Sequence, residues 1–299
     1  MRFRVSAFAD EASEALDGQI EALHEAGIDC LEIRGVDGRN ISKVTAAEAK
    51  ELRRRLDDAG IVVSSVGSPY GKSKVADDFA PHLEELKASL EVADILGARY
   101  LRMFSFFLDG KSHEECRDTV FERLDRMLET AAGSGVLFCH ENEKGIYGDR
   151  AVYCEELMQV FGDRMGCVYD PANFLQCGDD AYAAFERLRP CITYFHIKDV
   201  IRDGGTMVPA GEGDAHIPQM LEVLREEERT AFITVEPHLQ VFKGLAELEE
   251  DGGAAMRHKY QYASNRESFA AAAAALKRCL SEAGYREQLS ENVPVWTTK

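Results

Sequence analysis

The chain has 299 residues, of which 45% are hydrophobic and 29% charged, as is typical of a globular protein. Its formal net charge of −18 argues against non-specific binding to nucleic acid or to an anionic membrane, because both need a basic face. No stretch approaches the ~20 apolar residues of a membrane span, and the first residues lack the pattern of a secretion signal. We therefore expect a cytoplasmic protein whose eight cysteines are reduced and, with no CxxC pair, form no zinc ribbon.

The predicted elements alternate along the whole chain between short strands and amphipathic helices. Strands are expected at residues 4–8, 30–33, 61–66, 100–104, 136–139, 166–169, 192–195 and 231–235. Helices are expected at residues 14–26, 45–59, 81–96, 116–132, 151–161, 180–188, 217–227 and 266–283. Gly27 and Gly97 stand shortly before strands, which is typical of glycines that end helices in the left-handed conformation.

Eight strand–helix units spread evenly over the chain predict an α/β fold, a single-domain (β/α)8 TIM barrel over residues 1–299. A doubly wound open sheet is the alternative, since alternation alone does not prove that the sheet closes. No G-x-G-x-x-G follows the first strand, which weighs against a dinucleotide-binding sheet. The long connection 240–263 is expected to be a lid over the site, and residues 285–299 a tail that serves as a subunit contact or a frayed end.

Polar side chains follow the last four predicted strands, at the end of the barrel where active sites lie. The four strand ends read HENE (140–143), DPAN (170–173), HIKD (196–199) and EPH (236–238). Two glutamates, one aspartate and one histidine suit a divalent metal such as Mn²⁺, Zn²⁺, Co²⁺ or Mg²⁺, with positions left open for substrate. The other interpretation is a set of strand ends that face solvent, and four successive units with the same feature weigh against it.

The stretches HENE, YDPANF, FHIKD, GEGDAHIPQML and TVEPH resemble the sugar phosphate isomerase/epimerase superfamily, the xylose isomerase-like TIM barrels. The resemblance covers most of the chain and is most specific over residues 136–238. By analogy with the ketose 3-epimerase branch, it implies one metal ion with four ligands, Glu141, Asp170, His196 and Glu236. It also implies that Arg202, six residues after the metal histidine, contacts substrate. A substrate-contacting histidine of that branch falls on Asn173 here, and this departure points away from an identical substrate.

Metal-assisted proton transfer explains why an enzyme would need this set of residues. Removing a proton beside a carbonyl produces an enediolate, which a divalent ion stabilises as a Lewis acid. Two carboxylates that flank the ion can take up and return the proton, and Glu141 and Glu236 are the predicted pair. The sequence thus predicts a metal-dependent isomerase or epimerase of a small ketose, a polyol ketone or their phosphates.

Further residues have two interpretations each. Lys198 either points inward to a substrate oxygen or phosphate, or forms a rim salt bridge with Asp199 or Asp203. His216 is a candidate substrate contact, and Asp214 is expected to cap the helix that follows. His140 is expected to be structural.

Related activities remain open. Dehydratases of the inosose or 3-dehydroshikimate type use the same metal and the same proton abstraction, but the intermediate then expels hydroxide. A non-catalytic sugar-binding barrel is disfavoured, since it would not need both glutamates. Apurinic-site endonucleases share the barrel, but residues 64–70 and 102–108 lack the histidines of their zinc cluster. The expected partner is a small sugar or polyol, with no nucleic acid and no membrane, and homo-oligomerisation is left open.

Overall fold

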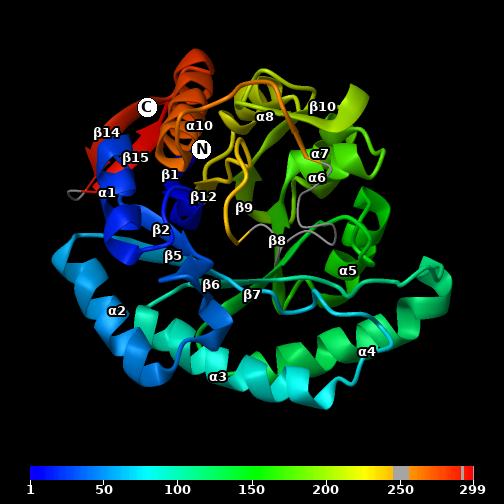
Figure 1. Ribbon diagram of the computed structural model, residues 1–299. Coiled ribbons are helices and arrows are strands. Elements are labelled where there is room, and N and C mark those ends of the chain that lie inside the picture. The colour runs from blue at the N-terminus through cyan, green and yellow to red at the C-terminus, as the bar shows by residue number, and fades with distance from the viewer. Residues whose placement is uncertain (245–255, 291–292, 299) are drawn as a thin grey trace.

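The computed structural model describes residues 1–244, 256–290 and 293–298, and at its centre lies a closed barrel of parallel strands (Figure 1). The barrel strands are β1 (Arg2–Ala7), β2 (Cys30–Ile33), β5 (Val62–Gly67), β6 (Tyr100–Met103), β7 (Leu137–Glu141), β8 (Met165–Tyr169), β9 (Ile192–Ile197) and β12 (Thr230–Val235). β12 pairs with β9 and also with β1, where the register runs from Arg2 opposite Thr230 to Ala7 opposite Val235. This pairing closes the sheet, so the predicted (β/α)8 barrel is confirmed and the open sheet is excluded.

A helix follows each barrel strand, and Figure 1 shows these helices arranged around the strands. They are α1 (Leu16–Ala26), α2 (Ala46–Asp58), α3 (Ala80–Leu96), α4 (His113–Ala131), α5 (Ala151–Phe161), α7 (Ala181–Leu188), α8 (Ile217–Leu224) and α10 (Asn265–Glu282), with the short α6 (Pro171–Gln176) before α7. α4 illustrates why these segments are helical. Its buried residues include Cys116, Val120, Leu124 and Met127, which recur at helical spacing, and a capping box of Ser112 and Glu115 begins it.

Two small sheets extend the loops that follow β2 and β9. β3 (Gly35–Val36) pairs with β4 (Arg39–Asn40), and β10 (Asp199–Ile201) pairs with β11 (Thr206–Val208). β13 (Arg257–His258) adds to β11 in parallel. Residues 245–255 of the predicted lid lie outside the described residues, so the lid over the site stays a prediction.

The described residues of the C-terminal segment form the two paired strands of a β-hairpin on the barrel. β14 (Arg286–Ser290) pairs with β15 (Val293–Thr297), and β15 runs antiparallel to the first residues of β1, with Trp296 opposite Phe3. Trp296 is buried there. The hairpin therefore lies at the amino end of β1, away from the strand ends that carry the polar motifs. Among the helices that the structure describes, none has the length and apolar character needed to cross a membrane.

Candidate metal centre

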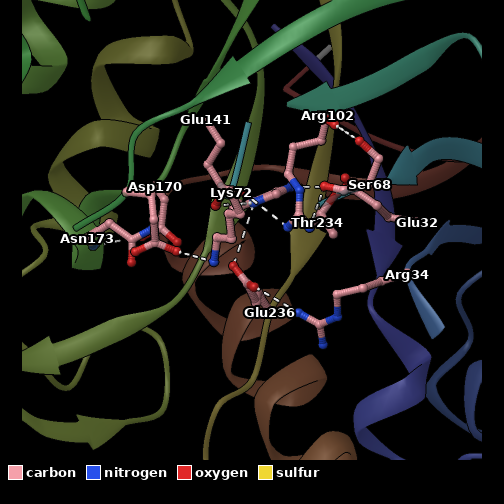
Figure 2. Close-up of polar contacts among 12 residues, drawn as sticks. Glu32, Arg34, Ser68, Lys72, Arg102, Glu141, Asp170, Asn173, Thr234 and Glu236 are labelled. Atoms are coloured by element: carbon pink, nitrogen blue, oxygen red, sulfur yellow. Dashed lines mark hydrogen bonds and ion pairs between the residues drawn. The ribbon is translucent and has the colours of Figure 1, made fainter. Parts of the chain in front are cut away.

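The four predicted metal ligands meet at the carboxyl ends of four neighbouring strands. Glu141 ends β7, Asp170 follows β8 as the N-cap of α6, His196 lies near the end of β9, and Glu236 directly follows β12. One donor atom from each residue lies within 4.8 Å of the others. All four side chains are buried, and Figure 2 shows Glu141, Asp170 and Glu236 extending toward a common centre.

The donor atoms of this cluster fit a divalent ion. Nδ1 of His196 lies 2.8 Å from Oε1 of Glu141 and 3.6 Å from Oε2 of Glu236. Oδ2 of Asp170 and Oε2 of Glu236 are buried, and neither accepts a hydrogen bond from any residue that the structure describes. Buried oxygens without a hydrogen bond are costly. The Lys198 ammonium, 3.1 Å from the first and 3.6 Å from the second, offsets part of that cost, and a divalent cation would offset it further. Three carboxylates and one imidazole suit Mn²⁺, Zn²⁺, Co²⁺ or Mg²⁺.

The charges within the cluster shift the proton affinities of its members. Burial raises the pKa of Asp170 to about 7, although the Lys198 ammonium opposes this change. Burial alone would lower the pKa of His196, but attraction to Glu141 and Glu32 outweighs it and raises the pKa to about 10. Burial would raise the pKa of Glu236, but Lys198 and other nearby positive groups hold it well below its usual value. Protons on His196 and Asp170 therefore compete with a metal ion for the same atoms.

Lys198 points into the cluster. Its Nζ lies 3.1 Å from Oδ2 of Asp170 and 3.6 Å from Oε2 of Glu236, and the side chain is buried. Asp199, by contrast, is occupied by hydrogen bonds from backbone N–H groups, including those of Gly211 and Gly213. The structure therefore favours the inward orientation of Lys198 over the rim salt bridge.

Each of the two predicted bases is held by an arginine from the first half of the chain. Nη1 of Arg102, on β6, lies 3.2 Å from Oε2 of Glu141. Nη1 of Arg34, which follows β2, lies 3.1 Å from Oε1 of Glu236. Figure 2 shows Arg34 beside Glu236. Sequence reasoning missed Arg102, whose one signal is a charged residue inside the short buried strand YLRM.

A second group of metal-type residues lies next to the first and shares Glu236 with it. Glu11, Glu236 and His238 place their donor atoms within 4.8 Å of one another. Arg34 already lies between the two carboxylates, 3.1 Å from Oε1 of Glu11 and 3.1 Å from Oε1 of Glu236. It also binds both oxygens of Asp10. Because a guanidinium supplies the positive charge here, we interpret this group as an ion-pair network and not as a second metal site.

Asn173 supports the cluster from its edge, whereas Glu143 and His140 are bonded to other residues. The backbone N–H of Asn173 donates to Oδ1 of Asp170 (3.0 Å), and its side chain donates to the carbonyl of Asn142 (2.9 Å). Glu143 lies beyond the end of β7 but is buried in an ion pair with Lys72 (2.7 Å). His140 bonds Ser105 away from the cluster, as expected of a structural imidazole.

Arg202 and His216 lie apart from the cluster, along a separate hollow that Asp180 and Asp214 also line. The guanidinium of Arg202 donates to the carbonyls of Gly178 and Asp179, and its backbone N–H donates to Asp214. The prediction that Asp214 caps α8 is wrong, because its carboxylate accepts a hydrogen bond from the backbone N–H of Arg202, and the N-cap residue is His216. Contacts of Arg202 and His216 with substrate stay predictions.

Comparison with known proteins places the chain in a family. A family model described as "Xylose isomerase-like TIM barrel" matches residues 20–278. The chain belongs to this family. The sequence matches no curated protein, so the other comparisons are with solved structures.

Several solved structures share this fold. A D-psicose 3-epimerase structure in the presence of D-fructose is 16% identical, covers 94% of this chain and 100% of its own, and has a TM-score of 0.72. The IOLI protein with a bound zinc atom is 17% identical over 94% of this chain and 99% of its own, with a TM-score of 0.70. The probable 3-DHS dehydratase AsbF from Bacillus anthracis is 16% identical over 92% of this chain and 99% of its own, with a TM-score of 0.69. At these identities the likeness shows the fold, and the neighbours include both sugar epimerases and a dehydratase.

Proposed function

We propose that the chain is a divalent-metal-dependent isomerase or epimerase of a small ketose or sugar phosphate, which moves a proton beside a carbonyl in the cytoplasm. The observation that carries the proposal is the buried cluster of four donor residues at the ends of four successive barrel strands. A divalent ion held by these residues would supply Lewis acidity to the substrate oxygens beside the reacting carbon.

Glu141 and Glu236 are the proposed bases, and each offers two oxygens with different surroundings. Oε1 of Glu141 faces His196, while Oε2 lies against Arg102. Oε2 of Glu236 faces Lys198, while Oε1 lies against Arg34. We assign proton exchange with the substrate carbon to the arginine-bound oxygens, because the others face the donor cluster. An arginine stabilises the anionic carboxylate and makes it a weaker base, so this assignment requires an acidified substrate carbon.

Lys198 is the proposed electrophilic partner of the two bases. Its ammonium is buried and lies between Asp170 and Glu236, so it would act in a site from which water is largely excluded. A hydrogen bond from this group to the substrate oxygen would stabilise the negative charge that develops as the proton leaves. Asn173 is proposed to contact substrate beside Asp170, and Arg202 and His216 to contact a more distant part of it.

The test is proton exchange at carbon in D₂O, measured across a panel of ketoses and their phosphates. Glu141→Gln and Glu236→Gln should each lower the exchange rate by at least about 10²-fold, the usual contribution of a general base. Glu84→Gln, a change on the exposed surface of α3, is the matched control and should retain full activity. Full exchange in either site variant would refute the two-base assignment.

The dehydratase alternative is kept because the same residues serve it and one structural neighbour is a probable dehydratase. Mass spectrometry of the product separates the two reactions, since a dehydratase product has lost one water and an epimerase product has not. A non-catalytic sugar-binding barrel predicts binding of the sugar without any exchange of deuterium into it.

A further inference from the structure

A third glutamate reaches His196 from a strand that is not a neighbour of β9. Glu32 lies on β2, and β1 and β12 separate that strand from β9 around the barrel. Its Oε2 lies 3.1 Å from Nε2 of His196. Nδ1 of the same ring lies 2.8 Å from Oε1 of Glu141. The two ring nitrogens therefore have separate surroundings, one in the donor cluster and one against Glu32.

Glu32 is held in one orientation by neighbours on other strands. The hydroxyl of Thr234 donates to Oε2 (2.9 Å), and the hydroxyl of Tyr194 donates to Oε1 (3.0 Å). The hydroxyl groups of Tyr194 and Ser65 are also hydrogen-bonded to each other (3.2 Å). Glu32 is 1% exposed and Tyr194 and Thr234 are fully buried, so water does not compete for these bonds. Figure 2 shows Glu32 and Thr234 on the side of the cluster away from Asp170.

We propose that Glu32 is a positioning residue of the metal centre, which accepts the Nε2 proton of His196 and directs the unprotonated Nδ1 toward the other ligands. A neutral imidazole can carry its proton on either nitrogen, and the hydrogen bond of one nitrogen decides which nitrogen is free to bind a metal. The wrong tautomer would point an N–H group at Glu141 and Glu236. A carboxylate that accepts the Nε2 proton also makes the imidazole a stronger metal ligand.

This inference rests on the proposed function, because it takes His196 to be a metal ligand. The competing explanation is that Glu32 only fills and cross-links the barrel interior. The two explanations differ in what they expect of metal affinity. A positioning residue changes the affinity even where the fold is intact, whereas a purely structural residue changes only the stability of the fold.

The experiment is a calorimetric titration of the full chain with Mn²⁺ and with Zn²⁺, for the wild type and for Glu32→Gln. Gln keeps the size of the side chain and removes its charge. We expect metal affinity to fall by about 10–100-fold, the usual effect of removing a carboxylate behind a metal-bound histidine. Glu84→Gln, on the exposed surface of α3, is the matched control: it makes the same chemical change away from His196, so its affinity should stay within about threefold of the wild type.

The absorption spectrum of the Co²⁺-loaded protein gives a second readout, since it reports the ligand environment and not the stability. It should change in Glu32→Gln and stay unchanged in Glu84→Gln. Should Glu32→Gln fail to fold, Glu32→Asp keeps the charge and withdraws the oxygen from Nε2 by one methylene, with the same loss of affinity expected. If a folded Glu32 variant binds the metal as tightly as the wild type, the role of Glu32 is overturned and the proposed function is untouched. A wild-type chain that binds neither ion would overturn it together with the proposed function.

Discussion

Individual side chains of the candidate metal centre bind either protons or a metal, and the balance between the two depends on pH. Without metal, His196 has a pKa raised to about 10 by Glu141 and Glu32, against the effect of burial, and burial raises that of Asp170 to about 7. Each group is protonated below its pKa and must lose that proton to act as a ligand. Metal binding at neutral pH must therefore release protons.

The expected result is a metal affinity that rises with pH. Between pH of about 7 and 10 the proton of His196 is displaced, so the affinity should increase by roughly tenfold per pH unit. Below that range the proton of Asp170 adds to the dependence. Calorimetric titration at pH 8 in buffers of different ionisation enthalpy measures the number of protons released. Binding that releases none would contradict this account.

Lys198 supplies a positive charge that should weaken the binding of a metal ion and assist the proposed reaction. Its Nζ lies 3.1 Å from Oδ2 of Asp170, one of the oxygens offered to the metal. Lys198→Met should therefore tighten Mn²⁺ binding by about tenfold, since like charges at short range repel. The same variant should lower proton exchange by about 10²-fold or more through loss of an electrophilic donor. Lys87→Met, on the exposed side of α3, is the control. Weaker metal binding in Lys198→Met would show that the lysine supports the ligands instead.

The loop that follows β11 depends on a single buried carboxylate. Asp199, the first residue of β10, accepts backbone N–H groups from Val200, Gly211, Gly213 and Ala215. At Gly213 an added Cβ would lie 2.2 Å from Oδ1 of Asp199. This close approach explains why the GEGDAH stretch carries a glycine there, and it sets the position of the residues around Asp214 and His216.

Asp199→Asn should destabilise the protein. The NH₂ group of the new amide would face backbone N–H groups, which in the wild type donate to the Asp199 carboxylate. We expect a loss of about 2–4 kcal/mol in the free energy of unfolding, given the cost of unsatisfied buried N–H groups. Urea denaturation followed by circular dichroism measures it. Asp203→Asn, a nearby change at an exposed residue, should leave the midpoint unchanged. Equal midpoints for the two variants would mean that Asp199 does not organise the loop.

For the molecule as a whole, the C-terminal hairpin adds to the barrel at the end opposite the metal centre. Trp296, the one tryptophan of the chain, is buried where β15 pairs with β1. Trp296→Ala should lower the free energy of unfolding by about 3–5 kcal/mol, as large-to-small changes at buried aromatic residues do. Metal affinity of the folded variant should be unchanged, because the ligands lie at the carboxyl ends of the strands.

Thermal unfolding and metal titration of the same samples test both parts of that expectation. Leu289→Ala on β14 is the control, since Leu289 is 74% exposed. A large loss of metal affinity in folded Trp296→Ala would show that the two ends of the barrel are coupled.

The sequence determined the repeating unit and the candidate ligand set of this protein. The alternation of strands and helices and the polar endings of four strands are local patterns, because strand and helix spacing depend on neighbouring residues. Glu141, Asp170, His196 and Glu236 follow from those endings and from a family resemblance over residues 136–238.

Only the tertiary structure decided how the two halves of the chain meet. Arg102 and Glu32 carry little local signal, since each is one charged residue in a short buried strand. Arg102 contacts Glu141 on the neighbouring strand, and Glu32 contacts His196 on a strand that is not its neighbour. The inward turn of Lys198 and the outward contacts of Arg202 likewise depend on carboxylates and carbonyls distant in sequence. Closure through β1 and β12 brings Glu32 to His196, and hydrogen bonds between strands more than 200 residues apart leave no periodicity in the sequence.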